Sequence, residues 1–330
     1  MSSQYALSRA SIAVPFFNTI KEYGKDPRII TKQLGIDDHV FTNSNLYLPS
    51  YSLGHLLDCS AKLTNCDDIG FISGHIGTTQ DLHPKLVSLL ANQETLMDAL
   101  LALSQWLHLQ GSHFNLEFEY IEGELRIYHT SSLHSSHRGF KHAHLFTTSR
   151  LIKLLSKYQG TDWKPNYIVL QPDIADTTQI AQKTENGRVL VGQPKSYIAI
   201  NCQIESMGAT NSTYRDKSTN ALQQLKIIIN TLWCTNNFSL ELIAHLFGIS
   251  ERTVQRIFTE SGDTFRNYIN NLKVDQAKQL LLQGFSVTQT AEKLQYTEPA
   301  NLSRAIKKQT GLSPMQYINQ HARDYTPELQ

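Results

Sequence analysis

The stretch Ser239-Leu-Glu-Leu-Ile-Ala-His-Leu-Phe-Gly-Ile-Ser250 returns about 48 residues later in altered form, as Ser286-Val-Thr-Gln-Thr-Ala-Glu-Lys-Leu-Gln-Tyr-Thr297. In each copy a serine that can cap a helix precedes apolar residues at helical spacing. In the first copy Gly248 permits the left-handed backbone of a tight turn. Each stretch predicts a helix, a turn and a second helix. We therefore expect helix-turn-helix motifs over residues 239–261 and 286–309.

The second helix of the first motif carries side chains suited to contacting DNA. Val254, Ile257 and Phe258 form an apolar face. The residues available for DNA are Glu251, Arg252, Gln255 and Arg256. Arginine can bond guanine, glutamine can bond adenine, and glutamate can accept from cytosine. Any solvated helix has a polar face, but the caps, the turn and the second copy favour DNA recognition.

The second helix of the second motif has a smaller and less charged outer face. Leu302, Ala305 and Ile306 form its apolar side. The residues expected toward DNA are Pro299, Ala300, Ser303, Arg304, Lys307 and Lys308. We expect the first motif to carry most base-specific hydrogen bonds. The second should add methyl contacts, phosphate anchoring and sensitivity to DNA shape.

The composition is that of a folded protein long enough for two domains. The 330 residues are 40% hydrophobic and 18% charged, which is ordinary for globular chains. No apolar run approaches the roughly 20 residues that cross a bilayer, and the first ten residues lack a signal-peptide pattern. The scattered cysteines are typical of reduced thiols; they are Cys59, Cys66, Cys202 and Cys234. We expect a cytoplasmic protein that does not associate with membranes.

The net charge does not by itself indicate a nucleic-acid partner. It is +1 for the whole chain, and the residues from Ala221 onward hold 11 Lys and Arg against 9 Asp and Glu, a net charge of +2. Non-specific DNA affinity grows with the number of phosphates neutralised. We therefore expect tight binding to depend on where the cations lie and on dimerisation through the other half.

The chain divides at a polar stretch without hydrophobic periodicity, residues 205–220, which is typical of a linker. Before it, residues 113–129 alternate in polarity around Glu122-Gly123, which predicts a hairpin. We expect residues 1–204 to form an α+β domain with a small sheet. Residues 221–330 should form an all-α domain whose two motifs are joined by a long helix. The predicted helices are 51–63, 85–109 with a break near residue 92, 140–158, 222–234, 240–247, 251–260, 265–282, 287–294, 298–308 and 314–321. Further strands are predicted at 167–170, 188–191 and 196–200.

A long series of residues follows a known family pattern: Ala244, Gly248, Ser250, Arg252, Thr253, Val254, Gln255, Arg256, Phe258, Gly262, Phe265, Tyr268, Ala277, Leu281, Ala291, Arg304, Lys307, Gly311, Pro314 and Tyr317. With these residues, from about Leu222 to Ala322, the chain resembles the DNA-binding domain of AraC/XylS-type transcription regulators. The upstream part resembles the arabinose-binding-like N-terminal domain of that family at residues 34–36, 68–71, 95–100 and 114–128. The resemblance implies an N-terminal domain that binds a small effector and supports dimerisation.

Four residues at three sites depart from the family pattern. Lys273 stands where the family often has Arg, Gln295-Tyr296 where it has Gly-Phe, and Leu302 where Phe is frequent. Because Gln295 lacks the conformational freedom of glycine, we expect the second motif to sit at a slightly altered angle.

Histidines are concentrated in the N-terminal half, which holds 11 of the 13. Five of them crowd together: His129, His134, His137, His142 and His144. A metal or pH sensor could use such a cluster. However, His142 and His144 stand two apart on a predicted helix and so point away from each other. We favour a polar surface or pocket lining and expect no metal site.

No pattern in the chain predicts catalysis. A nucleophile elbow, a phosphate-binding loop and a zinc-hydrolase helix are all missing from the sequence, and the glycines between Gly70 and Gly77 have the wrong spacing for a dinucleotide turn. We expect no enzyme, no catalytic residue and no cofactor. The family resemblance implies an effector pocket between the hairpin sheet and the helices. Its aromatic candidates are Phe114, Phe118, Tyr120 and Phe146, although their spacing favours ordinary core packing.

These patterns predict a bacterial transcription regulator, most simply an activator, that binds double-stranded promoter DNA and contacts RNA polymerase. A small effector bound to residues 1–204 would control it, and we expect a homodimer. Two alternatives remain open. The N-terminal half could serve dimerisation alone, or the cluster from His129 to His144 could respond to metal or pH.

Overall fold

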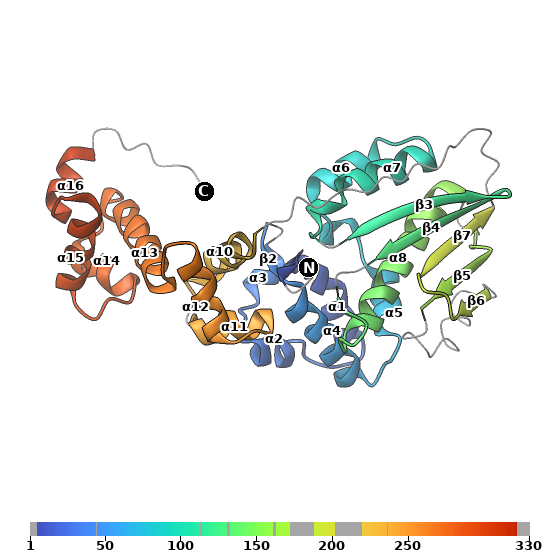
Figure 1. Ribbon diagram of the computed structural model, residues 1–330, viewed down its shortest axis with the longest axis horizontal. Coiled ribbons are helices and arrows are strands. Elements are labelled where there is room, and N and C mark those ends of the chain that lie inside the picture. The colour runs from blue at the N-terminus through green and yellow to red at the C-terminus, as the bar shows by residue number, and fades with distance from the viewer. Residues whose placement is uncertain are drawn as a thin grey trace. The chain divides into compact units, whose positions relative to one another are not determined.

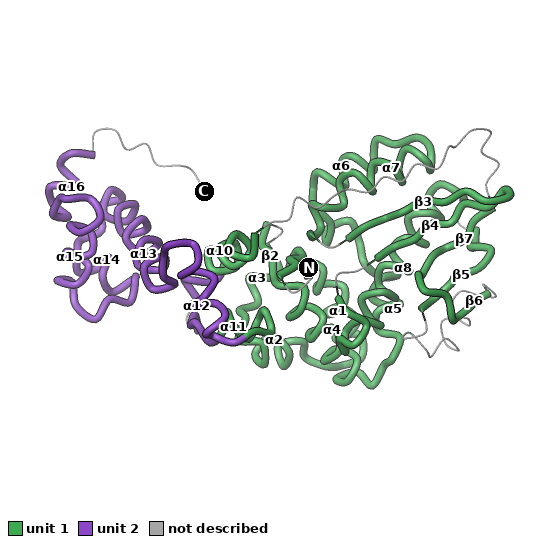
Figure 2. The backbone as a smooth tube through the Cα atoms, in the orientation of Figure 1, with its two compact units in different colours: residues 1–231, 242–249 green, residues 232–241, 250–330 purple. Residues whose placement is uncertain are grey.

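A computed structural model describes residues 5–43, 45–112, 114–130, 133–160, 163–171, 188–201, 220–235 and 237–321. The predicted linker lies outside the described residues except for Asn220, as does Cys202. The chain groups into two compact units, residues 1–231 with 242–249 and residues 232–241 with 250–330 (Figure 2). Within the described ranges, no helix combines the length and the apolar composition that crossing a membrane requires.

Helices form most of the first unit up to residue 112 (Figure 1). A small antiparallel pair of strands, in which Leu7 lies opposite Pro49, opens the unit. The bounds are β1 Leu7–Arg9, η2 Ala10–Ala13, α1 Val14–Glu22, α2 Arg28–Leu34, α3 His39–Thr42, β2 Tyr47–Pro49, α4 Ser50–Thr64, α5 Ile69–Ile76, η3 Thr79–Asp81, α6 Pro84–Ala91, α7 Leu96–Trp106 and η4 Leu107–Leu109. The predicted break near residue 92 is confirmed, because α6 ends at Ala91 and the Thr95 hydroxyl caps α7 by accepting from the Asp98 amide.

The second part of the first unit is a five-stranded sheet with a long helix against it. Its strands lie in the order β3-β4-β7-β5-β6, antiparallel except for the parallel pair β5–β6. The bounds are β3 Asn115–Ile121, β4 Glu124–Thr130, α8 Phe140–Gln159, β5 Tyr167–Leu170, β6 Arg188–Val191 and β7 Tyr197–Asn201. The predicted hairpin is confirmed: Glu122 and Gly123 both have positive φ, 51° and 85°, which suits the turn of a two-residue hairpin.

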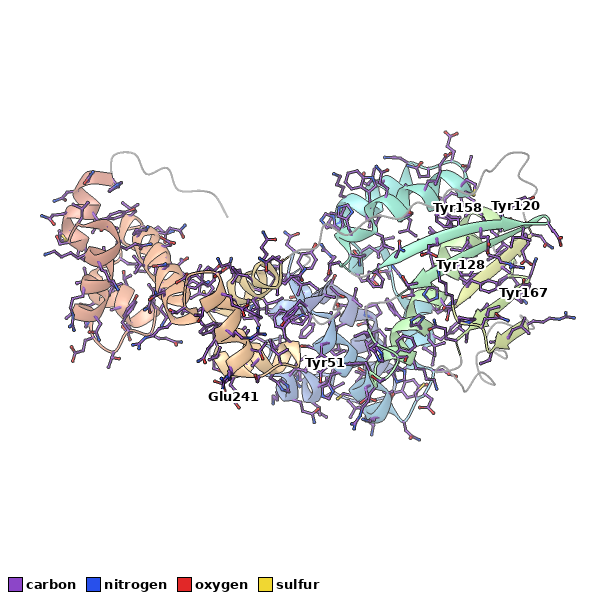
Figure 3. All side chains as sticks on the ribbon, in the orientation of Figure 1. Tyr51, Tyr120, Tyr128, Tyr158, Tyr167 and Glu241 are labelled. Atoms are coloured by element: carbon purple, nitrogen blue, oxygen red, sulfur yellow. The ribbon has the colours of Figure 1, made fainter. Side chains whose placement is uncertain are left out.

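The two faces of the sheet differ in character. On β4, Leu125 and Ile127 are fully buried and share one apolar cluster with side chains of α7 and α8. The opposite face carries tyrosines from neighbouring strands. The ring of Tyr197 lies 4.9 Å from that of Tyr128 and 6.0 Å from that of Tyr167, the latter two labelled in Figure 3. This alternation is why the period-two pattern predicts the strands correctly.

Helices α5 and α8 approach each other through two glycines. A β-carbon on Gly70 would lie 2.3 Å from the carbonyl oxygen of His142, and one on Gly74 would lie 2.6 Å from that of Phe146. Both distances are far below van der Waals contact, so no larger residue fits at either position without moving the backbone. Gly70 and Gly74, whose spacing does not fit a dinucleotide-binding turn, thus allow two helices to pack closely.

The C-terminal part is helical, as predicted. Its helices are α10 Ala221–Leu232, α11 Leu240–Phe247, α12 Glu251–Glu260, α13 Phe265–Leu282, α14 Val287–Lys293, α15 Pro299–Thr310 and α16 Pro314–His321. Local caps fix several ends. The hydroxyl of Ser250 accepts from the Thr253 amide, and Ser286 with Gln289 forms a reciprocal capping box, which satisfies backbone donors that a helix start leaves open. Val274, Ala277 and Leu281 of α13 are buried in the core beneath α14 and α15.

Candidate nucleic-acid interface and effector cavity

Helix α12 is held against α13 by its apolar face. Val254, Ile257 and Phe258 are buried, as their spacing predicts. The ring of Phe258 lies 5.8 Å from that of Phe265 and 5.6 Å from that of Tyr268. Aromatic contacts of this kind add to simple burial. The anchoring fixes which face of α12 is turned to solvent.

The outward face of α12 carries all four residues predicted for this motif. Glu251, Arg252, Gln255 and Arg256 are exposed. The Arg256 Nη1 donates to Glu260 Oε1 at 2.9 Å, one turn along the helix, and the two side chains are 62% and 60% exposed. Sequence reasoning did not name Glu260, although the i,i+4 spacing of opposite charges is the signal for it. An exposed pair of this kind contributes about 0.3–0.5 kcal/mol, so a nucleic-acid base can displace the glutamate.

Helix α15 is anchored by Leu302 and Ile306, both fully buried. Its predicted outer residues are exposed except for half-buried Ser303: Pro299, Ala300, Arg304, Lys307 and Lys308. The Ser303 hydroxyl donates to the carbonyl of Pro299 at 3.1 Å, and Arg304 Nη2 donates to Asn301 Oδ1 at 2.6 Å. The side chains of Ser303 and Arg304 are therefore already hydrogen-bonded within the helix.

The turns before the two outward helices differ at one position. Gly248 precedes α12 with φ 63°, and Gln295 precedes α15 with φ 57°. The left-handed region favours glycine because a β-carbon there crowds the following carbonyl oxygen. Gln295 therefore adopts the backbone of a glycine at a steric cost.

The histidine cluster is mainly buried, not a polar surface. His129, His142 and His144 are 3–5% exposed. Burial lowers the pKa of His142 and of His144 to about 4 and that of His129 well below its usual value, so all three are neutral near pH 7. Within the described ranges, no three His, Cys, Asp or Glu side chains are grouped to hold a metal ion. The metal-sensor alternative gains no support from this arrangement.

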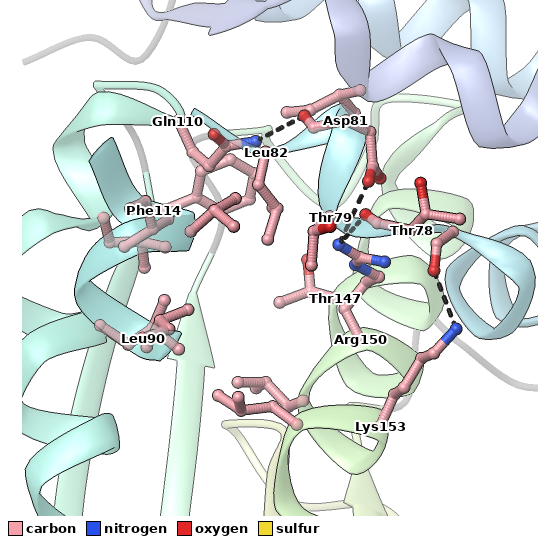
Figure 4. A pocket seen from close by; sticks show the side chains of 18 of the residues that line it. Thr78, Thr79, Asp81, Leu82, Leu90, Gln110, Phe114, Thr147, Arg150 and Lys153 are labelled. Atoms are coloured by element: carbon pink, nitrogen blue, oxygen red, sulfur yellow. Dashed lines mark hydrogen bonds and ion pairs between the residues drawn. The ribbon is translucent and has the colours of Figure 1, made fainter. Parts of the chain in front are cut away.

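The first unit contains a cavity of about 440 Å³ bordered by α6, α8 and β3 (Figure 4). Of the four aromatic candidates, Phe114 and Phe146 line it. Phe118 and Tyr120 belong to the neighbouring core cluster. Sequence reasoning missed three cations on α8 that also line the cavity: Arg150, Lys153 and Lys157. Their i, i+3, i+7 spacing on an otherwise amphipathic helix was the available signal.

Two helices with exposed arginines on one small helical scaffold define a class of DNA-binding domain, and comparison with known proteins agrees. Residues 243–320 match the family model described as a helix-turn-helix domain. The chain is 36% identical over 77 residues to the HTH-type transcriptional regulator RipA of Corynebacterium diphtheriae, covering 23% of each protein. It is 23% identical over 107 residues to the transcriptional activator RhrA of Rhizobium meliloti, covering 32% of this chain and 34% of RhrA.

The matched segments thus span about a quarter to a third of the length of these relatives. Among solved structures, the transcriptional regulator CdpR from Pseudomonas aeruginosa aligns over 89% of this chain and 96% of its own, with a TM-score of 0.40 and 14% identity. The C-terminal domain is a helix-turn-helix domain of the AraC type. Domains of this class bind DNA in transcription regulators and are not enzymes.

Proposed function

We propose that the chain is a transcription regulator that recognises promoter DNA with α12 and anchors itself with α15. The observation that carries the proposal is the face of α12. Arg252, Gln255 and Arg256 are exposed together above a fully packed apolar face, and they lie within the matched helix-turn-helix domain. Arginine and glutamine are the side chains that form bidentate contacts with guanine and adenine.

The connection through α13 supports two adjacent contacts on one duplex. Both α12 and α15 pack on this helix, which has 18 residues and so a length of about 27 Å at about 1.5 Å per residue. Successive major-groove faces on one side of DNA are about 34 Å apart. The length of α13 is comparable with this spacing when the widths of α12 and α15 are added to it. Arg304, Lys307 and Lys308 on α15 suit phosphate contacts.

Residues 1–204 supply control in this proposal. A small effector binds within residues 1–204, and the chain acts as a cytoplasmic homodimer. The effector-bound dimer contacts RNA polymerase and activates transcription. The low net charge of the residues from Ala221 onward, +2, supports the need for a dimer, because few phosphates are neutralised per chain. An effector shifts such an equilibrium only by binding one arrangement more tightly than the other.

The DNA-recognition proposal is tested by selecting sites from a random double-stranded library with the full chain and measuring affinity by mobility shift. Arg256→Ala should weaken binding to the selected site by about 1–3 kcal/mol, the worth of one bidentate base contact. It should also relax discrimination at one base pair. Arg304→Ala should weaken selected and scrambled sites alike, because a phosphate contact carries no sequence information.

The matched control is Arg28→Ala, which removes another exposed arginine that is paired with a single carboxylate, Asp26. That variant should bind the selected site like the unchanged chain. If no site is enriched, or if Arg256→Ala leaves affinity and discrimination unaltered in a folded protein, α12 does not read DNA.

A further inference from the structure

The cavity of the first unit is apolar over most of its wall. α6 contributes Leu86, Val87 and Leu90, and α8 contributes Phe146, Leu151 and Leu154. Its volume of about 440 Å³ falls in the range of small-molecule sites, roughly 300–1,000 Å³. Burying a hydrocarbon chain against such a wall removes apolar surface from water and so favours binding. It offers little to a ligand with many hydroxyl groups, because buried groups without partners are costly.

One end of the cavity is polar and already braced (Figure 4). Arg150 Nη2 donates to the carbonyl of Thr78 at 2.9 Å and to Asp81 Oδ1 at 3.3 Å. The Gln110 side chain accepts from the His83 amide at 2.8 Å and donates to the Asp81 carbonyl at 3.3 Å. Both the oxygen and the nitrogen of the Gln110 side-chain amide are therefore hydrogen-bonded within the protein. The hydrogen bonds of Arg150 within the described residues use Nη2 alone, which leaves its Nε and Nη1 donors for a ligand.

The charges in the lining of the cavity are unbalanced toward positive. Arg150, Lys153 and Lys157 line the cavity along one stripe of α8, and Asp81 is the one acidic side chain in the lining. The Arg150 side chain is 16% exposed and Asp81 is 4% exposed. Burial raises the pKa of the Asp81 carboxyl and lowers that of the Arg150 guanidinium, and each charge partly opposes the effect on the other. The Arg150–Asp81 contact at 3.3 Å is longer than the 2.7–2.9 Å typical of a charge-assisted hydrogen bond. The Arg150 guanidinium can therefore still bind a second anionic group.

The two lysines add positive charge along the same stripe of α8, Lys153 about one turn and Lys157 about two turns after Arg150. Lys153 Nζ donates to the carbonyls of His75 and Gly77 at 2.8 and 2.9 Å. Lys157 Nζ lies 5.5 Å from the ring centre of Tyr158. Among the residues that the structure describes, no ion pair joins Lys153 or Lys157 to a carboxylate. An anionic group near Arg150 would therefore lie about one turn from Lys153, which two carbonyl oxygens already hold in place, and about two turns from Lys157.

We propose that this cavity binds an amphiphilic carboxylate, a ligand with a single carboxylate head and an aliphatic tail. The head pairs with Arg150, with Lys153 and Lys157 adding to the attraction, and the tail lies between α6 and α8. The inference rests on the proposed effector role of the first unit and names the chemical class of its ligand. Sugars and free polar amino acids do not suit the apolar wall. A neutral hydrocarbon has no anionic group to pair with Arg150.

The test measures binding of decanoate to the full chain by isothermal titration calorimetry, with decan-1-ol and acetate as probes that lack the head or the tail. Decanoate should bind at least tenfold more tightly than decanol, and acetate should give no measurable heat. Arg150→Gln should reduce decanoate affinity by about ten- to a hundredfold, with little effect on decanol, because it removes a charge-assisted contact. Val87→Trp should abolish binding of both, since the larger side chain fills the apolar part.

The matched control is Lys141→Gln, a cation on the same helix that does not line the cavity. It should leave decanoate affinity unchanged. If Arg150→Gln does not fold, exposed Lys153→Gln serves instead, with a smaller loss expected. Equal binding of decanol and decanoate, or decanoate binding that persists in folded Val87→Trp, would overturn the inference. If decanoate does not bind but the chain still recognises a selected DNA site, the ligand class is rejected and the DNA-binding proposal stands.

Discussion

Gln295 is the residue at which the second helical pair departs most clearly from ideal backbone geometry, with φ 57° between α14 and α15. Gln295→Gly should raise the free energy of unfolding of the second unit by about 0.5–1 kcal/mol. The left-handed conformation costs a non-glycine residue about 1–2 kcal/mol, and glycine removes this cost. The greater freedom of glycine in the unfolded chain opposes the gain in stability by about 0.4–1 kcal/mol. Urea unfolding followed by tryptophan fluorescence measures the change in a background that keeps Trp233, which packs on the core of this unit, as its one tryptophan.

The control for this substitution is Gln295→Ala, which removes the same side chain and keeps a β-carbon. It should leave the urea midpoint nearly unchanged, because the side chain of Gln295 is exposed and the backbone strain persists. A lower midpoint for the glycine variant than for the alanine variant would contradict a strained turn. The expectation that α15 sits at a changed angle is a separate prediction. It can be checked by comparing the DNA footprints of the two variants.

The packing of α5 against α8 predicts a large effect from a single methyl group. Gly70→Ala places a β-carbon 2.3 Å from the His142 carbonyl oxygen, and backbone on both sides must move. We expect a loss of about 1–3 kcal/mol, the range for overpacking in a rigid core, despite the better helix propensity of alanine. Chemical unfolding of the full chain measures it. His75→Ala on the exposed side of α5 should change stability by less than about 0.5 kcal/mol, and equal effects of the two variants would exclude close packing as the cause.

The elements that sequence predicts well are those whose cause is local. The Glu122-Gly123 turn, the Thr95 cap and the buried stripe of α12 each follow from neighbouring residues, and the structure has all three. The cavity was not predictable in the same way. Its cations lie on α8 and its apolar wall comes partly from α6, about sixty residues earlier in the chain. Helical spacing shows that Arg150 and Lys157 share a face, but it does not show what that face meets.

At the scale of the whole molecule, the buried histidines predict how folding depends on pH. The pKa of His142 and of His144 is lowered to about 4, and that of His129 lies well below its usual value, in each case because burial disfavours the charged ring. An unfolded histidine titrates near pH 6.5. As pH falls below that value, the unfolded chain binds protons that the folded chain does not accept. Stability is therefore complete above about pH 6.5 and decreases as pH falls toward 4, which is the sign expected for groups with a lowered folded-state pKa.

Each histidine that stays neutral contributes a slope of about 1.4 kcal/mol per pH unit in that window. Urea unfolding of the full chain at pH 7.5, 6.0 and 5.0 should show this decline. His144→Gln should make it shallower by about one histidine, and exposed His39→Gln controls for the loss of a ring elsewhere. The same data separate a structural cluster from a pH sensor. A sensor would change DNA affinity between pH 7.5 and 6.0 while the chain remains folded. These buried rings instead predict constant affinity until the protein begins to unfold, and a pH-dependent affinity that His144→Gln abolishes in the folded state would contradict the structural role.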